Sequence, residues 1–317
     1  MIFAPDSWEI KWLPNPFTFN RFSMRILRKH RIRQHMTLIV GIVCKGGIVL
    51  ASDSQTTIGG QSKRCDTEKI RVVEFQNGES ILVAQAGCFD TSSRTIDILE
   101  KLAASHQLTD ECSVIGLVRQ AILKSRNEIR EQNFNCSSEE MDAIIERLDL
   151  DAHFMVAHYV RHQDPLWYQA FLHTFSFRQG TCRTSKAFYE SLGCGAAVAN
   201  LLMSEYCESR MAPSLGLVNA TLIIDKVIKH DAFCGHPIRC ALIYAFTGIP
   251  TASNVQVKSV QEIDSILQRI RQIDTETKTE RVGRLQSGLA GLVNTFEPYP
   301  PNDIRLSDQR GPVPAIV

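Results

Sequence analysis

Met36-Thr37-Leu38-Ile39-Val40-Gly41 begins the part of the chain that decides the fold, and Ala51-Ser52-Asp53-Ser54 and Thr67-Glu68-Lys69-Ile70 follow it. Residues 37–43 and 48–53 are apolar and rich in β-branched side chains, and the glycines between them are typical of a turn, which predicts the two strands of a hairpin. A hydroxyl, a carboxylate and an amine therefore stand at the ends of neighbouring short strands.

Further strands are predicted at residues 69–75 and 80–86, around Asn77-Gly78, and at residues 154–160 and 166–175. An Asn-Gly pair between β-branched runs is a strong hairpin signal. Most positions in these strands are apolar instead of alternating with polar ones, so we expect sheets that are covered on both faces.

Helical periodicity appears between and after the strands. The predicted helices are residues 90–105, with Asp90 as the cap, then 113–132, 195–206, 214–230, 260–273 and 282–296. The order is thus strands, two helices, strands, two helices and a last strand at residues 239–246, followed by a helical extension. Two antiparallel sheets packed face to face, with helices outside each, fit this order, which predicts an α+β fold of four layers, αββα.

Four segments are expected along the chain. Residues 1–36 become basic without a following apolar segment, which is not the order of a signal peptide. We interpret them as a propeptide or as upstream sequence that the mature protein lacks. Residues 37–250 form the predicted four-layer domain, residues 251–296 a helical extension, and residues 297–317 a proline-rich, disordered tail.

Composition narrows the class of protein. The 317 residues carry a net charge of +1, with 44% hydrophobic and 22% charged residues, which favours a globular domain over a nucleic-acid-binding protein. No run of about 18 apolar residues predicts a membrane span. The ten cysteines stand singly and the histidines lack zinc-site spacing, so we expect reduced thiols, no metal, no cofactor and a cytoplasmic location.

Thr37 has the surroundings of a nucleophile. The simplest base for a threonine hydroxyl is the residue's own α-amino group, whose pKa of about 7.7–8.0 lies near working pH. This requires Thr37 to be the first residue of the mature chain, and an initiator Met36 before a small residue is normally removed. A nearby ammonium would help to hold the hydroxyl and the amine in their reactive states, and a carboxylate would keep that ammonium in place.

The spacing of these three residues, Thr37, Asp53 and Lys69, resembles that of proteasome β-type subunits and their bacterial relatives. The sequence motifs around them are also similar to those of that family: Gly-Ile-Val-Leu-Ala-Ser-Asp-Ser at residues 47–54, and Ala86-Gly87 at the end of a predicted strand.

Two later motifs extend the resemblance to about residues 37–247. Leu192-Gly193-Cys194-Gly195 is similar to the Gly-Ser-Gly of that family, and Asp231-Ala232-Phe233-Cys234-Gly235 is similar to its Asp-x-x-Ser-Gly. The resemblance implies the N-terminal-nucleophile hydrolase fold, and hydrolysis of peptide bonds in polypeptide substrates by a homo-oligomer that self-associates into a ring. Neither the sequence nor the resemblance identifies an unfoldase partner.

The roles of single residues follow from the resemblance by position. Thr37 would be the nucleophile and, through its amine, the general base, while Lys69 would tune the pKa values and Asp53 would orient Lys69. The Gly87 N–H would supply the oxyanion hole, and the Thr57 backbone would align an extended substrate like an added strand. The remaining positions would form the network beside the amine: Cys194, Asp231 and Cys234.

Cys194 and Cys234 depart from the family pattern, which has serines there. Thiols are weak donors and acceptors, so the network would be looser. A non-catalytic ring subunit therefore stays an alternative, as does an N-terminal-nucleophile amidase that acts on a small amide. Taken singly, Thr37 could be a strand start, Asp53 a turn residue and Lys69 a solvated strand lysine.

Met36 bears on the fate of the upstream segment. Propeptides of the resembled family usually end in glycine, so a translation start at Met36 competes with self-processing as the interpretation of residues 1–36. If these residues stayed attached, the Thr37 nitrogen would be an amide without basicity, and the chain would be inactive.

Overall fold

The computed structural model describes residues 37–58, 62–133, 136–161, 168–245 and 255–295. Contacts divide the chain into two compact units, Met1–Asp264 and Ser265–Val317. The first unit contains both five-stranded sheets and all the predicted site residues.

The first sheet has five antiparallel strands in the order β10-β1-β2-β11-β12. Their bounds are β1 Leu38–Cys44, β2 Gly47–Asp53, β10 Tyr189–Gly193, β11 Ile238–Tyr244 and β12 Val255–Lys258. The hairpin of β1 and β2 is confirmed, and both strands are buried along almost their whole length. β12 falls in the predicted helical extension, but it pairs with β11 and so belongs to this sheet.

The second sheet is also antiparallel, in the order β5-β6-β7-β8-β9. Its strands are β5 Ile70–Glu74, β6 Ser80–Gly87, β7 Ala152–Arg161, β8 Tyr168–Ser176 and β9 Cys182–Thr184. The predicted hairpins of β5 with β6 and of β7 with β8 are confirmed, although the turn predicted at residues 162–165 lies outside the described residues. A separate two-stranded hairpin, β3 Thr56–Ile58 with β4 Ser62–Arg64, was not predicted.

Apolar side chains from both sheets fill the space between them. The cluster includes, from the first sheet, Ile39, Ile48, Leu50 and Ala241 and, from the second, Leu82, Ala84, Met155 and Leu172. Each of these side chains is almost fully buried. Both sheets also carry helices on their outer faces, which explains why most positions of the long strands β1, β2 and β6 are apolar.

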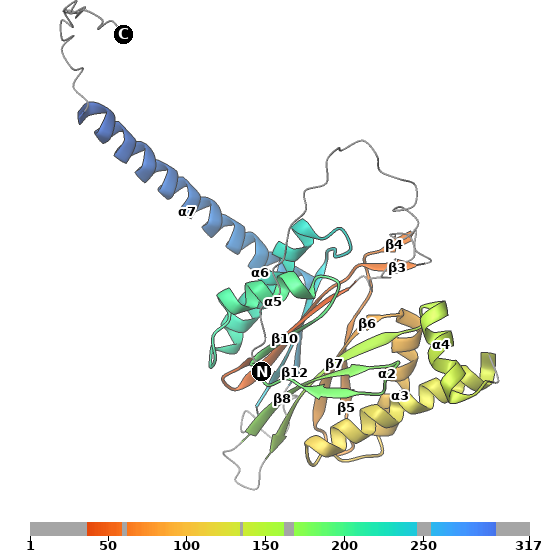
Figure 1. Ribbon diagram of the computed structural model, residues 1–317. Helices are drawn as coiled ribbons and strands as arrows, with labels where there is room; N and C mark the ends of the chain where they lie inside the picture. Colours follow the sequence, from red (N-terminus) through yellow and green to blue (C-terminus); the bar gives the residue numbers. More distant parts are fainter. Residues whose placement is uncertain (1–36, 59–61, 134–135, 162–167, 246–254, 296–317) are drawn as a thin grey trace, which may run out of the picture. The chain divides into compact units, whose positions relative to one another are not determined.

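Helices form the two outer layers (Figure 1). They are α2 Phe89–Ala103, α3 Glu111–Asn133 and α4 Ser138–Leu148 on the side of the second sheet, and α5 Ala196–Tyr206 and α6 Pro213–His230 on the side of the first. The four-layer αββα sandwich is therefore confirmed.

Two details of the helices differ from the prediction. Cys88 is the N-cap residue of α2. Asp90 lies within the first turn, where its negative charge interacts favourably with the positive end of the helix dipole. Helix α4 was not predicted, although Ser137 and Glu140 form a capping box at its start. The Ser137 hydroxyl accepts the Glu140 N–H at 3.2 Å, and the Glu140 carboxylate accepts the Ser137 N–H at 2.8 Å.

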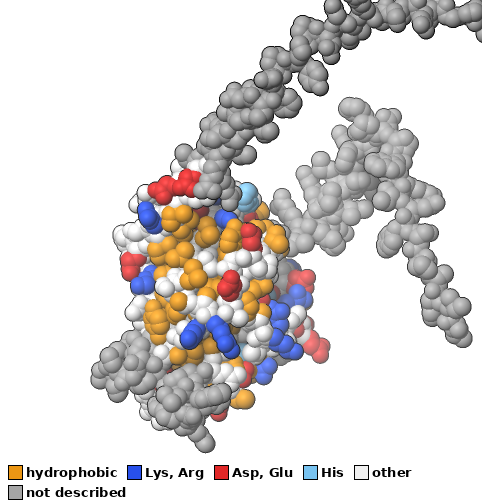
Figure 2. Space-filling view, turned by 90° about the vertical axis from the view of Figure 1, so that its left-hand side faces the viewer, with side chains coloured by type: hydrophobic (Ala, Val, Ile, Leu, Met, Phe, Trp, Pro, Cys, Tyr) orange, Lys and Arg blue, Asp and Glu red, His pale blue; other side chains and the backbone are white. Residues whose placement is uncertain are grey.

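Helices α5 and α6 expose apolar side chains on their outer surface. Val198, Leu201 and Leu215 are 41%, 70% and 50% exposed. Figure 2 shows hydrophobic side chains gathered across the face of the molecule on which these helices lie, with charged side chains scattered among them. An exposed apolar face of this kind is unusual for a surface that contacts only solvent.

The helical extension is one helix, α7 Val260–Thr295, where the sequence predicts two, at residues 260–273 and 282–296. The intervening Asp-Thr-Glu-Thr-Lys-Thr-Glu-Arg at residues 274–281 contains neither glycine nor proline, so nothing in it ends a helix. Over the residues that the structure describes, α7 and the other helices are too polar or too short to cross a membrane.

Candidate active site

Thr37 lies directly before β1 and is 4% exposed. Its carbonyl oxygen accepts the Cys194 N–H at 2.9 Å and the Cys194 thiol at 3.4 Å. This approach requires Gly193, which has φ +106° and whose missing Cβ would lie 1.8 Å from the Thr37 oxygen. The end of β10 therefore fixes the backbone of the candidate nucleophile.

Asp53 ends β2, fully buried, and both of its carboxylate oxygens accept hydrogen bonds. Oδ1 accepts the Leu38 N–H at 2.8 Å, and Oδ2 accepts the N–H groups of Gly235 at 3.1 Å and Gln55 at 3.2 Å. The carboxylate thus holds the residue that follows Thr37 and the loop that precedes β11.

Lys69 directly precedes β5 and forms an ion pair with Asp53. Its Nζ lies 2.8 Å from Asp53 Oδ1 and 2.5 Å from the Gln55 carbonyl oxygen, which accept its hydrogen bonds. The lysine is only 2% exposed, so the alternative of a solvated strand lysine is wrong. One oxygen atom therefore binds both the Lys69 ammonium and the backbone next to Thr37.

Burial is the largest influence on the pKa of the Asp53 carboxyl and raises it, whereas the Lys69 ammonium and the N–H groups of Leu38 and Gly235 lower it. All the hydrogen bonds described at this carboxylate come from donors, so a protonated carboxyl would have to displace one of them. The geometry therefore fits the ionised carboxylate beside a charged Lys69.

Cys194, Asp231 and Cys234 come together beside Thr37. Cys194 follows β10, and Asp231 and Cys234 lie in the loop from α6 to β11. The two sulfurs are 3.7 Å apart, and the Sγ and carboxylate oxygen atoms of the three residues lie within 4.8 Å of one another. Their hydrogen bond lowers the pKa of the Cys194 thiol and raises that of the Cys234 thiol.

Residues 34–137 match the family model described as proteasome subunit. That segment includes Thr37, Asp53, Lys69 and Gly87. The matched segment is 104 of the 317 residues, and over that part the chain is similar to proteasome subunits. None of the curated proteins compared with it is a significant match.

Solved structures of Anbu proteins are similar to this chain. Anbu (ancestral beta-subunit) from Yersinia bercovieri has a TM-score of 0.58 and 11% identity, over 76% of this chain and 96% of that one. The Anbu complex from Pseudomonas aeruginosa, solved as a helical assembly, has a TM-score of 0.58 and 17% identity, over 84% of this chain and 98% of that one. At these identities the similarity shows the fold.

Two further predicted site residues, Gly87 and Thr57, lie outside the first sheet. Gly87 ends β6, in the second sheet, and its φ of +96° is one that glycine adopts without strain. Thr57 lies in the middle of β3 and pairs with Lys63 of β4. The oxyanion role of Gly87 and the substrate-aligning role of Thr57 stay predictions.

Gln55 and Gly235 join the two halves of the site, and neither was among the predicted site residues. The Gln55 side chain donates through Nε2 to the Ala232 carbonyl oxygen at 3.1 Å, while its backbone carbonyl accepts from Lys69. A Cβ on Gly235 would lie 2.5 Å from Gln55 Oε1. The only local signal was the place of Gly235 at the end of the Asp-x-x-Cys-Gly motif.

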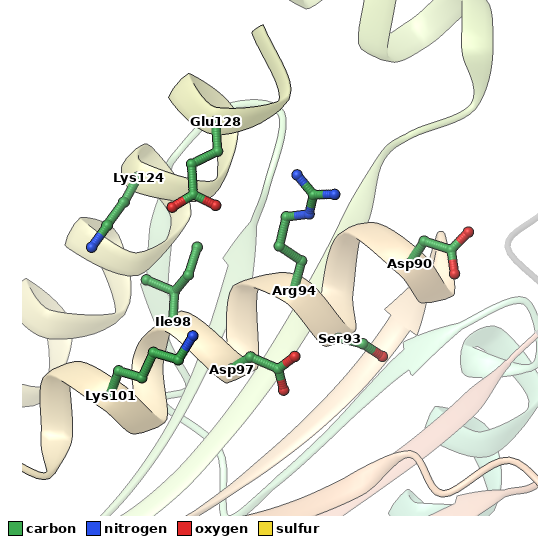
Figure 3. A pocket seen from close by; sticks show the side chains of 8 residues that line it. All are labelled: Asp90, Ser93, Arg94, Asp97, Ile98, Lys101, Lys124 and Glu128. Atoms are coloured by element: carbon green, nitrogen blue, oxygen red, sulfur yellow. The ribbon is translucent and has the colours of Figure 1, made fainter. Parts of the chain in front are cut away.

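A pocket between α2 and α3 lies apart from these residues (Figure 3). Its lining is Asp90, Ser93, Arg94, Asp97, Ile98, Lys101, Lys124 and Glu128. Three acidic groups face three basic ones, so the pocket favours neither anions nor cations, and it contains none of the predicted catalytic residues.

Proposed function

We propose that the chain is a threonine-type endopeptidase in which Thr37, as the first residue of the mature protein, is both nucleophile and general base. The observation that carries this proposal is the buried Asp53–Lys69 ion pair, whose shared oxygen also holds the Leu38 N–H. Burying a charged pair is costly, and apolar residues of similar volume would stabilise the fold as well or better. A role in chemistry explains why the pair lies next to Thr37.

The proposed reaction uses the unblocked Thr37 amine. The amine takes the hydroxyl proton as the oxygen attacks the peptide carbonyl, and it returns that proton to the leaving amine, which leaves an ester on Thr37. Water, activated by the same amine, then hydrolyses the ester. The Lys69 charge favours the ionised hydroxyl oxygen and the neutral amine, and the Gly87 N–H is assigned to the developing oxyanion.

A non-catalytic ring subunit is the second candidate. It is favoured by Cys194 and Cys234, because the thiol contact to the Thr37 carbonyl is 3.4 Å long and thiols are weak donors. It does not account for the buried Asp53–Lys69 pair, since a subunit that only assembles has no need of a charged group at that place.

We also propose that the chain self-associates through the exposed apolar face of α5 and α6. Val198, Leu201 and Leu215 supply this face, and exposed apolar patches of folded proteins mark contact surfaces (Figure 2). The similar Pseudomonas aeruginosa Anbu protein was solved in a helical assembly. A second copy of this chain is the partner we propose.

The test compares two forms of the protein, the full chain and a chain whose translation starts at Met36. Intact mass gives the first residue of each, and fluorogenic peptides measure turnover. We expect turnover only where the mass shows Thr37 as the first residue, and we expect Thr37→Ala to remove it without changing the circular dichroism spectrum. Turnover by a protein that retains residues 1–36, or by Thr37→Ala, would overturn the proposal. Cleavage of small amides but not of peptides would replace it with the amidase alternative.

A further inference from the structure

Cys194, Cys234 and Asp231 place two sulfurs and a carboxylate around one point beside Thr37. Cys194 and Asp231 are half-buried and Cys234 is 4% exposed. Part of the surface of Cys194 and Asp231 therefore faces solvent, and the neighbouring Ala232 and Phe233 are exposed.

We propose that Cys194, Cys234 and Asp231 bind a thiophilic divalent cation, with zinc as the best-fitting member of that class. Zinc binds thiolate sulfur and carboxylate oxygen, and three protein ligands with a water in the fourth position make a complete tetrahedral site. Binding replaces the thiol protons with the metal and releases them to solvent.

The spacing of the sulfurs supports this proposal. Two sulfurs at about 2.3 Å from a tetrahedral zinc ion lie about 3.8 Å apart. The observed separation of Cys194 Sγ and Cys234 Sγ is 3.7 Å, so zinc could enter without moving either sulfur. A disulfide would instead need the sulfurs to approach to about 2.05 Å.

The loop that carries Asp231 and Cys234 is held in place by its own contacts. Asp231 Oδ1 accepts the Phe233 N–H at 2.8 Å, which orients the carboxylate. The Asp231 carbonyl accepts the Cys234 N–H at 3.1 Å, and Gly235 is tied to Asp53. Because the ligands are positioned before any ion binds, little ordering opposes binding.

Neither the spacing of the cysteines nor that of the histidines in the sequence predicts this site. The ligands come from two loops, one after β10 and one after α6, and only the fold joins them. Both cysteines stand where the resembled family has serines, and hydroxyls would not select a soft cation.

The consequence for activity rests on the proposed function. Cys194 Sγ lies 3.4 Å from the Thr37 carbonyl oxygen, so a bound cation would place positive charge beside the nucleophile. As ligands of the cation, Cys194, Cys234 and Asp231 could no longer take part in the network beside the Thr37 amine. We expect zinc to inhibit turnover and a chelator to restore it.

The experiment titrates Zn²⁺ into the reduced, metal-free full chain by calorimetry and in competition with a chromophoric chelator, and repeats the titration with Co²⁺. We expect one zinc per chain, proton release on binding, and thiolate-to-cobalt charge-transfer absorption. The double variant Cys194→Ser/Cys234→Ser should bind more than about 100-fold more weakly, because even outer-shell changes cost 10–100-fold. The control Cys65→Ser/Cys112→Ser, which alters two exposed cysteines, should bind like the unaltered chain.

Absence of a stoichiometric zinc site, or equal binding by the Cys194→Ser/Cys234→Ser chain, would overturn the inference. Asp231→Asn is a milder variant that keeps both sulfurs, and it should weaken binding with no change in circular dichroism. The titration needs no peptidase activity. A chain with Thr37 as its first residue that binds zinc, but cleaves nothing after the zinc is removed, therefore refutes only the proposed function. An active chain without the zinc site refutes only this inference.

Discussion

The carbonyl oxygen of Thr37 occupies the place where a side chain on Gly193 would begin, 1.8 Å from the position of its Cβ. This close approach lets the Cys194 N–H reach the same oxygen at 2.9 Å. The backbone of the candidate nucleophile is thus held by a glycine 156 residues away in the sequence.

Gly193→Ala tests this relationship. The added methyl group overlaps the Thr37 carbonyl and also strains a residue with φ +106°, so we expect a loss of about 2–5 kcal/mol in the free energy of unfolding. Urea denaturation measures the loss. Gly78→Ala is the matched control, because Gly78 has φ +79° but nothing within 4 Å of its Cβ position. It should lose only about 1–2 kcal/mol, and equal losses in the two variants would show that the clash with Thr37 is unimportant.

His158 and His173 form a second buried polar contact, between strands β7 and β8. Their Nε2 atoms lie 2.9 Å apart, so one ring donates and the other accepts, and both rings are fully buried. Burial lowers the pKa of His158 to about 3, with a further contribution from His173, and burial lowers that of His173 to about 4. The Glu111 carboxylate lies 3.9 Å from His173 Nε2, which is too far for it to offset the lowering of the His173 pKa by burial.

Acid should therefore destabilise the fold. The folded pKa values lie below the unfolded value of about 6.5, so the stabilisation from the two neutral rings is complete above about pH 6.5. It is lost as the pH falls from there to the folded pKa values of about 4 for His173 and about 3 for His158. At pH 5 the two histidines together should account for a loss on the order of 2–4 kcal/mol relative to pH 7. Urea denaturation at both pH values measures it. The double variant His158→Phe/His173→Phe should lose most of this dependence, and His106→Gln, at an exposed histidine, should keep it. Identical pH dependence in all three proteins would contradict the prediction.

The sequence predicts most of the two sheets because their long strands carry a continuous local signal. β1, β2, β6 and β7 are each seven or more residues of mainly apolar side chains. The strands that were not predicted have only three to five residues, and β9 and β12 are also polar at several positions. Pairing with distant strands, not local propensity, makes them extended.

The site was predictable to the extent that side chains define it. Thr37, Asp53 and Lys69 carry recognisable chemistry at a recognisable spacing. Gln55 and Gly235 contribute mainly through a carbonyl oxygen and an N–H group, which every residue type offers, and Gly235 meets Asp53 across 182 residues of sequence. Only the fold shows such partners.

Helix α4 did have a local signal, the capping box of Ser137 and Glu140. Ser137→Ala removes the hydroxyl that accepts the Glu140 N–H, so we expect a loss of about 0.5–2 kcal/mol and faster amide exchange in the first turn of α4. Hydrogen exchange and urea denaturation measure both. Glu139→Ala, at an exposed first-turn residue that does not take part in the box, is the control and should lose less. Equal effects would mean that the box does not stabilise α4.

Lys69→Met tests the central ion pair. The substitution keeps most of the side-chain volume but leaves Asp53 buried without its cation, so we expect a loss of about 3–5 kcal/mol in the free energy of unfolding together with loss of peptidase turnover. Arg71→Met is the matched control. Arg71 lies two residues further along, half-buried, and pairs with the more exposed Asp97 and Glu100. Its loss should be about 1 kcal/mol or less, with turnover retained.

The double variant Asp53→Asn/Lys69→Met separates stability from chemistry. Removing both charges relieves the unpaired carboxylate, so the double variant should recover part of the stability that Lys69→Met loses. Turnover should stay absent, because the Lys69 charge that favours the ionised Thr37 hydroxyl is missing in both variants. Urea denaturation and fluorogenic peptides, applied to chains whose mass shows Thr37 as the first residue, measure the two quantities. Recovery of turnover along with stability would mean that the pair supports the fold alone, and Lys69 would then have no part in the reaction.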